Sequence, residues 1–330
     1  MEQAYVLDTK EVVAVNGTNL HIRLRSCDIR NPVVLFLHGG PGVCDRHWVL
    51  KYQSPLAEKC TMVCCDQRAS GKSFTRAQLK ETMTVDQVVE DMRQLVEYLC
   101  QRFHKEKLIL VGHSWGSFLG TLLASRHPER IAAYIGMGQL ADGPENERIS
   151  YEFVYNEAKK RNDQKAIRDL ERIGAPKAGL YASLEDLMVQ RDYMTKFGGG
   201  GYKESASIWK SMILPLLSTP EYTLFDLPKY SQGAFYNLRQ LWNDVAVSSF
   251  QRDVTSLTVP VYITQGRHDQ NTPSQLAKAW FDALEAPYKE WFWFDESAHS
   301  PIKEEPERWG SVVEEIICRT AALNENAEPL

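Results

Sequence analysis

A serine between two glycines follows directly after a short apolar run. Residues 112–116 read Gly-His-Ser-Trp-Gly, and Leu108–Val111 come just before them. The pattern G-x-S-x-G is typical of a sharp strand-to-helix turn that exposes a serine hydroxyl. Glycine is needed at both ends because such a turn crowds the backbone. We therefore identify Ser114 as the candidate nucleophile, with residues 117–126 forming the helix that follows it.

A serine hydroxyl becomes a good nucleophile only when a base takes its proton and an acid orients that base. When the serine stands in such a turn, its partners follow in the chain order serine, acid, histidine. Of the eight histidines, only His299 follows every plausible acid. It lies in a loop after the apolar segment Trp291–Phe294, where a strand would reach the sheet edge at which ligands bind. His299 is the predicted base.

The acid should lie in the loop after the preceding strand, at the same edge of the sheet. Asp269 does so, because it comes shortly after the apolar segment Val261–Thr264. Its expected task is to accept the Nδ1–H group of the histidine and to stabilise the imidazolium. Asp253 and Asp295 are alternatives that lie less well relative to strand ends, and Asp282 falls inside a predicted helix.

An acyl-transfer site must also stabilise a developing oxyanion, usually with backbone N–H groups. One donor is expected from the residue after the nucleophile, which is Trp115. The second should come from the loop after the strand Val33–Leu37, which reads His-Gly-Gly-Pro-Gly over residues 38–42. Its glycines let an N–H group face a substrate without side-chain crowding. We assign Gly40 as the second donor.

The elements needed to position these residues alternate between strands and helices. Asn16-Gly17 predicts a turn between two opening strands, and helical spacing recurs over residues 86–100. Apolar runs predict further strands at 33–37, 62–65, 108–111, 132–137, 261–264 and 291–294, with helices at 274–284 and 308–320. This order predicts an α/β fold with a mostly parallel central sheet and helices on both faces.

The alternation stops between residues 140 and 255, where we find no clear buried strand. We expect a helical cap there, inserted after the sixth strand. The predicted core domain then comprises residues 1–139 and 256–330, and the cap domain residues 140–255. A cap above the carboxyl edge would roof the pocket.

Bulk composition argues against several classes of partner. The net charge is −5 with a pI near 6.0 and there is no long basic run, so we expect neither nucleic acid nor an anionic membrane as a partner. No apolar run approaches the roughly 18–20 residues of a membrane span, and Met-Glu-Gln does not resemble a signal peptide. A cytoplasmic location is the expectation; the oligomeric state stays open.

Two other patterns have simpler explanations than a cofactor. Seven cysteines without a C-x-x-C unit favour neither a disulfide framework nor a metal site, and Cys60, Cys64 and Cys65 are expected to be small buried residues. Ser70–Ser73 ends like a phosphate-binding loop, but Asp66 stands where that motif needs glycine. We therefore expect no cofactor and no metal.

Five motifs together resemble the prolyl iminopeptidase branch of the α/β-hydrolase fold. They are HGGPG at 38–42, Asp66-Gln67-Arg68 leading to Ser-Gly-Lys-Ser, GHSWG at 112–116, GRHD at 266–269 and SAHS at 297–300. The resemblance covers roughly residues 10–140 and 255–320. It implies an enzyme without a cofactor that removes an N-terminal residue, typically proline, from short peptides. It also implies the triad Ser114, Asp269 and His299, with Gly40 and Trp115 as oxyanion donors.

The cap departs from that family. Prolyl iminopeptidases carry a Trp-x-x-Trp-Glu segment whose glutamate, with another acid, binds the free amine of the substrate. Near the comparable place this chain has Trp209 followed by Lys210. The candidate substrate contacts are Trp209, Glu204 and Glu221. Two alternatives therefore remain beside a peptidase: an esterase, lactonase or specialised amidase that does not recognise a free amine, and a non-catalytic binding protein of the same fold.

Overall fold

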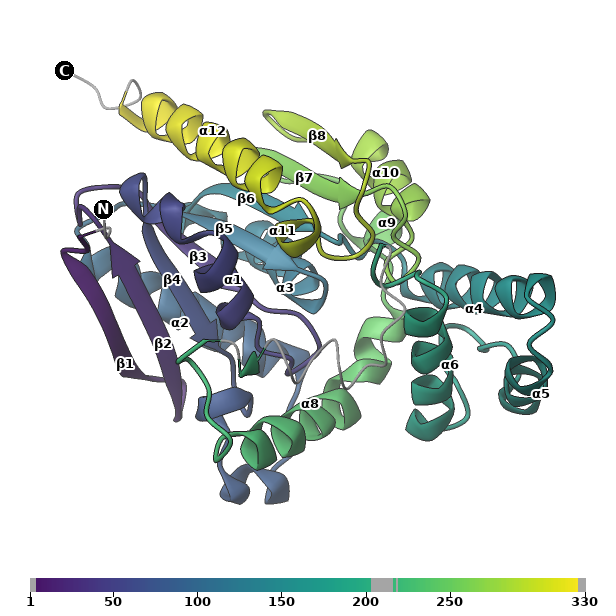
Figure 1. Cartoon of the computed structure of the whole chain (residues 1–330). Helices are drawn as coiled ribbons and strands as arrows, with labels where there is room; N and C mark the ends of the chain where they lie inside the picture. Colours follow the sequence, from purple (N-terminus) through teal and green to yellow (C-terminus); the bar gives the residue numbers. More distant parts are fainter. Residues whose placement is uncertain (1–3, 203–215, 218, 326–330) are drawn as a thin grey trace.

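An eight-stranded sheet forms the centre of the computed structural model, which describes residues 4–202, 216–217 and 219–325 (Figure 1). The strand order is β1-β2-β4-β3-β5-β6-β7-β8. The β1/β2 and β2/β4 pairs are antiparallel and all others are parallel. The strands are β1 (Leu7–Val15), β2 (Thr18–Ser26), β3 (Val33–Leu37), β4 (Thr61–Asp66), β5 (Leu108–His113), β6 (Ile131–Met137), β7 (Val261–Gly266) and β8 (Lys289–Phe294).

Helices cover both faces of this sheet. The α-helices that pack around the sheet are α1 (Arg46–Tyr52), α2 (Val85–Arg102), α3 (Trp115–Arg126), α10 (Ser274–Ala283), α11 (Pro301–Glu304) and α12 (Pro306–Glu325). The short helix α9 (Phe250–Asp253) falls within the range predicted for the cap, but its Phe250 packs into a core of the sheet. One apolar core contains side chains of α2, α3 and α10, and a second, on the other face, contains side chains of α1 and α12. The expected mostly parallel sheet with helices on both faces is therefore confirmed.

The central strand β3 shows why continuous apolar runs predicted buried strands. Successive side chains of a strand point to opposite faces, so a strand covered on both sides must be apolar throughout. Leu35 and Leu37 pack into the core with α2 and α3, while Val34 and Phe36 pack into the core with α1 and α12.

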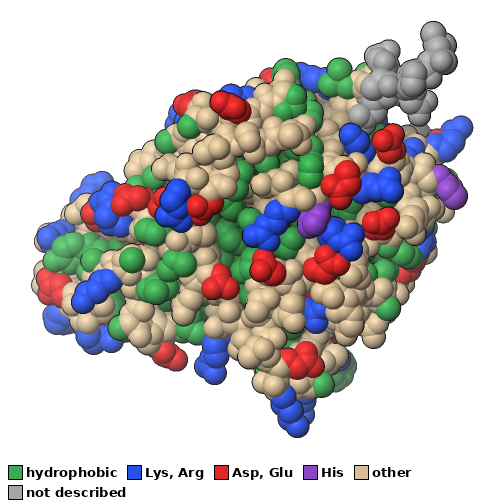
Figure 2. Space-filling view, turned by 180° about the vertical axis from the view of Figure 1, so that it is seen from behind, with side chains coloured by type: hydrophobic (Ala, Val, Ile, Leu, Met, Phe, Trp, Pro, Cys, Tyr) green, Lys and Arg blue, Asp and Glu red, His purple; other side chains and the backbone are tan. Residues whose placement is uncertain are grey.

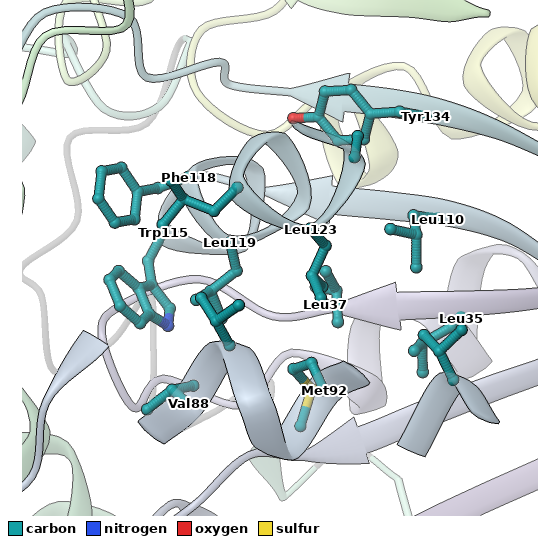
Figure 3. Packing of buried hydrophobic residues seen from close by; sticks show 14 of the residues in the cluster. Leu35, Leu37, Val88, Met92, Leu110, Trp115, Phe118, Leu119, Leu123 and Tyr134 are labelled. Carbon is teal, nitrogen blue, oxygen red and sulfur yellow. The ribbon is translucent and has the colours of Figure 1, made fainter. Parts of the chain in front are cut away.

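Helix α3 is held rigidly against the sheet, which matters because the candidate nucleophile precedes it. Leu119 and Leu123 are at most 1% exposed and lie on the side of α3 that faces α2 and Leu37 of β3 (Figure 3). Met92 and Val88 supply the contacts from α2. Helix α2 itself begins at a capping box in which Thr84 accepts the Gln87 N–H group.

A group of helices follows β6 and precedes β7, on one side of the sheet (Figure 1). They are α4 (Gly143–Lys160), α5 (Gln164–Ile173), α6 (Leu184–Lys196) and α8 (Leu227–Val247). Helices α4, α5 and α6 share an apolar cluster of their own, separate from the two sheet cores. Among the described residues between β6 and β7 there is no strand, as expected for a helical cap after the sixth strand.

Some local predictions needed adjustment. Helix α1 was not predicted, and α3 begins at Trp115 rather than at residue 117. Cys60, Cys64 and Cys65 are buried, as predicted. In the part of the chain that the structure describes, no helix has the length and apolar character to span a membrane. Acidic and basic side chains are interspersed on the face shown in Figure 2.

Candidate active site

Ser114 occupies the tight turn between β5 and α3. Its backbone has φ +55° and ψ −118°, a conformation that few non-glycine residues adopt. The turn is tied to the neighbouring strand by a hydrogen bond from the Ser114 N–H group to the Met137 carbonyl, 2.9 Å long. A Cβ atom on Gly116 would lie 1.9 Å from the Leu37 carbonyl oxygen, so this glycine cannot be replaced without moving β3 or α3.

The predicted base and acid are hydrogen-bonded to each other. Nδ1 of His299 lies 3.0 Å from Oδ2 of Asp269. His299 lies in the loop after β8, and Asp269 in the loop after β7, at the carboxyl ends of two adjacent parallel strands. Asp269 is fully buried and His299 is 8% exposed. Gly138, after β6, packs against the imidazole, since a Cβ there would lie 3.0 Å from its Cε1 and Nδ1 atoms.

The carboxylate of Asp269 is itself held in a fixed orientation. Its Oδ1 atom accepts the backbone N–H groups of Asn271 and Thr272, both at 2.9 Å. Its Oδ2 atom accepts the Thr272 hydroxyl at 2.7 Å and the Gln265 amide at 2.9 Å. These hydrogen bonds hold the carboxylate in the orientation in which Oδ2 faces the imidazole.

The two competing acids lie elsewhere. Asp295 pairs with Arg267 and Asp253 pairs with Arg252, and all four side chains are about half or more exposed. The segment Ser70–Ser73, which resembles a phosphate-binding loop, makes hydrogen bonds within the protein: the Lys72 N–H group and the Ser73 hydroxyl both donate to Asp66. Among the described residues, no group of three or more His, Cys, Asp or Glu side chains is placed to hold a metal ion.

The glycine-rich loop after β3 packs against the serine. A Cβ on Gly39 would lie 3.3 Å from the Ser114 Cβ atom, so this loop approaches the nucleophile closely. Gly40 has φ +120°, a region open only to glycine, and a Cβ there would lie 2.5 Å from the Gly42 nitrogen. Within the described part of the chain, the N–H groups of Gly40 and Trp115 donate to no other group. Both are therefore available to an oxyanion.

A cavity of about 460 Å³ is lined by both the predicted nucleophile and the predicted base. Ser114, His299, Gly39 and Gly40 line it from the core side. Most of its wall is apolar and comes largely from α6 and α8: Val43, Trp48, Leu187, Met188, Met194, Tyr230, Ala234, Phe235, Leu238 and Trp242. The cap therefore provides most of the apolar wall, and the core carries the predicted catalytic residues.

Charged groups of the lining were not singled out from the sequence. Arg191 and Asp192 of α6 both line the cavity. The Arg191 guanidinium is bound to the buried Glu147 carboxylate at 2.6 Å and lies over the Trp242 ring. Partial burial raises the pKa of Asp192. Charged residues are frequent throughout this cap, so no spacing in the sequence distinguishes these two.

A second histidine–carboxylate pair lies beside the first. Nδ1 of His113 is 3.1 Å from Oδ2 of Asp45, and its Nε2 is 3.2 Å from the His299 carbonyl oxygen. The hydroxyl of Ser300 lies 3.3 Å from the same Nε2 atom. Both residues of the pair are buried and both line the cavity. His113 thus connects the turn that carries Ser114 to the loop that carries His299.

Of the three predicted substrate contacts, only one can be placed. Glu204 and Trp209 lie outside the described residues. Glu221 does not line the cavity: it is 2% exposed, and its carboxylate pairs with Arg23 at 3.2 Å and with Arg46 at 3.6 Å. Its position gives no support to a role in substrate binding, because its charge is already balanced by two arginines.

Comparison with known proteins identifies the family. A family model described as "alpha/beta hydrolase fold" matches residues 32–306. This chain belongs to the α/β-hydrolase family. It is 30% identical over 309 residues to a "Probable aminopeptidase YbaC" of Bacillus subtilis (strain 168), covering 93% of this chain and 92% of that protein.

The predicted likeness to prolyl iminopeptidases is also confirmed. A "Proline iminopeptidase" of Clostridioides difficile (strain 630) is 26% identical over 293 residues, which is 87% of this chain and 89% of that protein. The crystal structure of a proline iminopeptidase from Mycobacterium smegmatis superposes with a TM-score of 0.61 at 14% identity, covering 96% of this chain and all of the other. At that identity the superposition shows the shared fold alone.

Proposed function

We propose that this α/β hydrolase works through an acyl-enzyme on Ser114 and releases an N-terminal residue, proline or a small or hydrophobic one, from short peptides or amino-acid amides. The observation that carries the proposal is the His299–Asp269 hydrogen bond of 3.0 Å beside a cavity that also contains the strained Ser114. The names of the relatives from Bacillus subtilis and Clostridioides difficile support the peptidase part.

The mechanism follows from the partners of each group. The Ser114 hydroxyl attacks the substrate carbonyl while Nε2 of His299 takes its proton, and Asp269 stabilises the resulting imidazolium. The N–H groups of Gly40 and Trp115 stabilise the tetrahedral oxyanion. The imidazolium then protonates the leaving amine. In the second half, His299 takes a proton from a water molecule that attacks the acyl group, and then returns a proton to the Ser114 oxygen as the acid leaves.

Recognition of a free amine would require an acid in the cavity. Among the described residues, two acids line the cavity: Asp192, on cap helix α6, and Asp45, whose carboxylate is already hydrogen-bonded to His113. Glu204 remains a candidate outside the described residues. Among these we favour Asp192, because it already faces the cavity.

The test of the mechanism is Ser114→Ala together with a fluorophosphonate probe. The parent should be labelled at Ser114 and should hydrolyse an aminoacyl aryl amide, and the variant should do neither. A variant that hydrolyses the amide at the parent's rate would exclude the acyl-enzyme. A parent that is never labelled at neutral pH would favour a non-catalytic binding protein.

A second candidate function is an esterase, lactonase or amidase for an acyl group without a free amine. The predominantly apolar wall favours it, since most of the lining side chains from α6 and α8 are apolar. Matched aryl amides and esters, each with a free or an acetylated amine, separate the two candidates. Loss of turnover on acetylation supports the aminopeptidase, whereas equal turnover supports the second candidate.

A further inference from the structure

The side chain of Gln67 joins the two segments that carry the oxyanion donors. Gln67 directly follows β4 and is 2% exposed. Its Oε1 atom accepts the indole N–H group of Trp115 at 2.8 Å, and its Nε2 atom donates to the His38 carbonyl at 3.1 Å. We propose that Gln67 is a positioning residue that sets the separation between the N–H groups of Gly40 and Trp115; this rests on the proposed acyl-enzyme function.

The two partners leave the amide only one orientation. An indole N–H group can only donate and a carbonyl oxygen can only accept, so the glutamine oxygen must face Trp115 and its nitrogen must face His38. A reversed amide would lose both hydrogen bonds in a buried place, at a cost for each unpaired group. The bridge is therefore directional as well as buried.

The backbone of Gln67 fixes the same loop a second time. Its N–H group donates to Nε2 of His38 at 3.1 Å, so that nitrogen carries no proton. The proton of the neutral ring is then on Nδ1, which donates to the Gly39 carbonyl at 2.9 Å. Burial lowers the pKa of His38, in agreement with a neutral ring. One residue thus holds the loop at the carbonyl and at the ring of His38.

The contacts of Gln67 reach the residue two positions before Gly40, which is His38, and the side chain of Trp115 itself. Gly39 is followed by Gly40, whose N–H group is the proposed loop donor, and Trp115 carries the other donor on its own backbone. The Trp115 side chain is 2% exposed and does not line the cavity, so its indole anchors the helix start and does not bind substrate. A shift of either anchor would change the distance between two N–H groups that must meet one oxygen atom.

Gln67→Met tests the proposal, because methionine has a similar length, cannot donate to the His38 carbonyl and is only a weak acceptor for the indole N–H group. We expect kcat for an uncharged aryl ester to fall about tenfold to a hundredfold while KM changes less than about threefold. The affinity for an aryl trifluoromethyl ketone, which forms an oxyanion on the serine, should fall in parallel with kcat/KM. An ester is used so that the result does not depend on amine recognition.

Two further variants separate positioning from a loss of stability. Gln78→Met removes another buried amide, which accepts the Thr75 N–H group and donates to the Thr18 hydroxyl at the start of β2. None of these residues lines the cavity, so the variant should lower the unfolding midpoint without lowering kcat. Trp115→Phe removes the indole N–H group and keeps an aromatic ring. Combined with Gln67→Met it should lower kcat little more than the larger single effect, because both variants break the same bridge.

The outcomes are distinguishable from failure of the proposed function. If Gln67→Met lowers the unfolding midpoint but keeps the parent's kcat and ketone affinity, Gln67 has a structural role only and the proposal is overturned. If Gln67→Met lowers kcat and Trp115→Phe then lowers it independently and multiplicatively, the bridge between them is not the cause. If Ser114→Ala hydrolyses the ester as fast as the parent, the acyl-enzyme itself is excluded, whatever Gln67 does.

Discussion

Nδ1 of His299 lies 3.0 Å from Oδ2 of Asp269, and the other carboxylate oxygen is fixed by two backbone N–H groups. A carboxylate held in this way can only accept from the imidazole, so it places the ring proton on Nδ1. The opposite nitrogen, Nε2, is then free to take the proton of a serine. The geometry therefore sets the tautomer that the proposed mechanism needs.

Asp269→Asn should abolish the preference of the His299 ring proton for Nδ1 with little change in the shape of the side chain. The asparagine amide can present its N–H group to Nδ1, which moves the ring proton to Nε2 and blocks the uptake of the Ser114 proton. We expect kcat to fall about ten-thousandfold. Steady-state kinetics measure the loss, and circular dichroism checks the fold. Thr272→Val, which removes one hydrogen bond to Asp269 but keeps the carboxylate, should lose far less; equal losses would contradict this account.

The His113–Asp45 pair should align the base through its main chain. His113→Phe combined with Asp45→Asn removes the contact to the His299 carbonyl without leaving a buried unpaired carboxylate. We expect kcat to fall about tenfold, since misplacement of a catalytic group by a fraction of an ångström is costly. The rate of fluorophosphonate labelling at Ser114 should fall with it. An unchanged labelling rate would show that His299 keeps its place without this pair.

The sheet and its edge were predictable from the sequence because their signals are local. Val33–Leu37 and Leu108–Val111 are apolar throughout, as only strands covered on both faces need to be. Asp269 and His299 each come shortly after such a run, and parallel strands bring their carboxyl ends to one edge. Position along the chain was thus enough to bring these two residues together.

The cap could not be predicted in the same detail. The contacts of Glu221 come from Arg23 and Arg46, which lie far away in the sequence, so no local pattern marks them. Helical periodicity likewise does not say which side of α6 faces the core, and Arg191 and Asp192 became visible as lining residues only in the folded chain. Helix α1 was missed because its buried residues include an arginine and a histidine.

Glu221→Gln should therefore change stability rather than substrate affinity. Its carboxylate is 3% exposed and faces the buried guanidinium of Arg46, whose other partner is Asp66. The variant leaves Arg46 with Asp66 as its remaining ion-pair partner and removes one carboxylate from a buried charge cluster, so we expect the free energy of unfolding to fall by about 3 kcal/mol. Urea denaturation measures this change, and KM should stay within about twofold of the parent. A large rise in KM at unchanged stability would restore Glu221 as a substrate contact.

His47 should make the fold sensitive to mild acid. It is 2% exposed, and neither ring nitrogen has a hydrogen-bond partner among the described residues. Burial lowers the pKa of His47 to about 4. The unfolded chain binds this proton near pH 6.5, more readily than the folded chain. The free energy of unfolding is therefore unaffected by this histidine above about pH 6.5. It falls as the pH drops from about 6.5 toward 4, by up to about 3 kcal/mol.

His47→Phe keeps a ring in the same place and removes the titrating group. We expect the variant to lose less stability than the parent between pH 7 and pH 4.5, measured as the free energy of unfolding in urea at each pH. Some acid sensitivity should remain, because burial also lowers the pKa of His21 and of His38. His104→Gln, at an exposed position, is the matched control for loss of a histidine. Identical pH profiles for His47→Phe and the parent would show that the folded chain accommodates a charged His47.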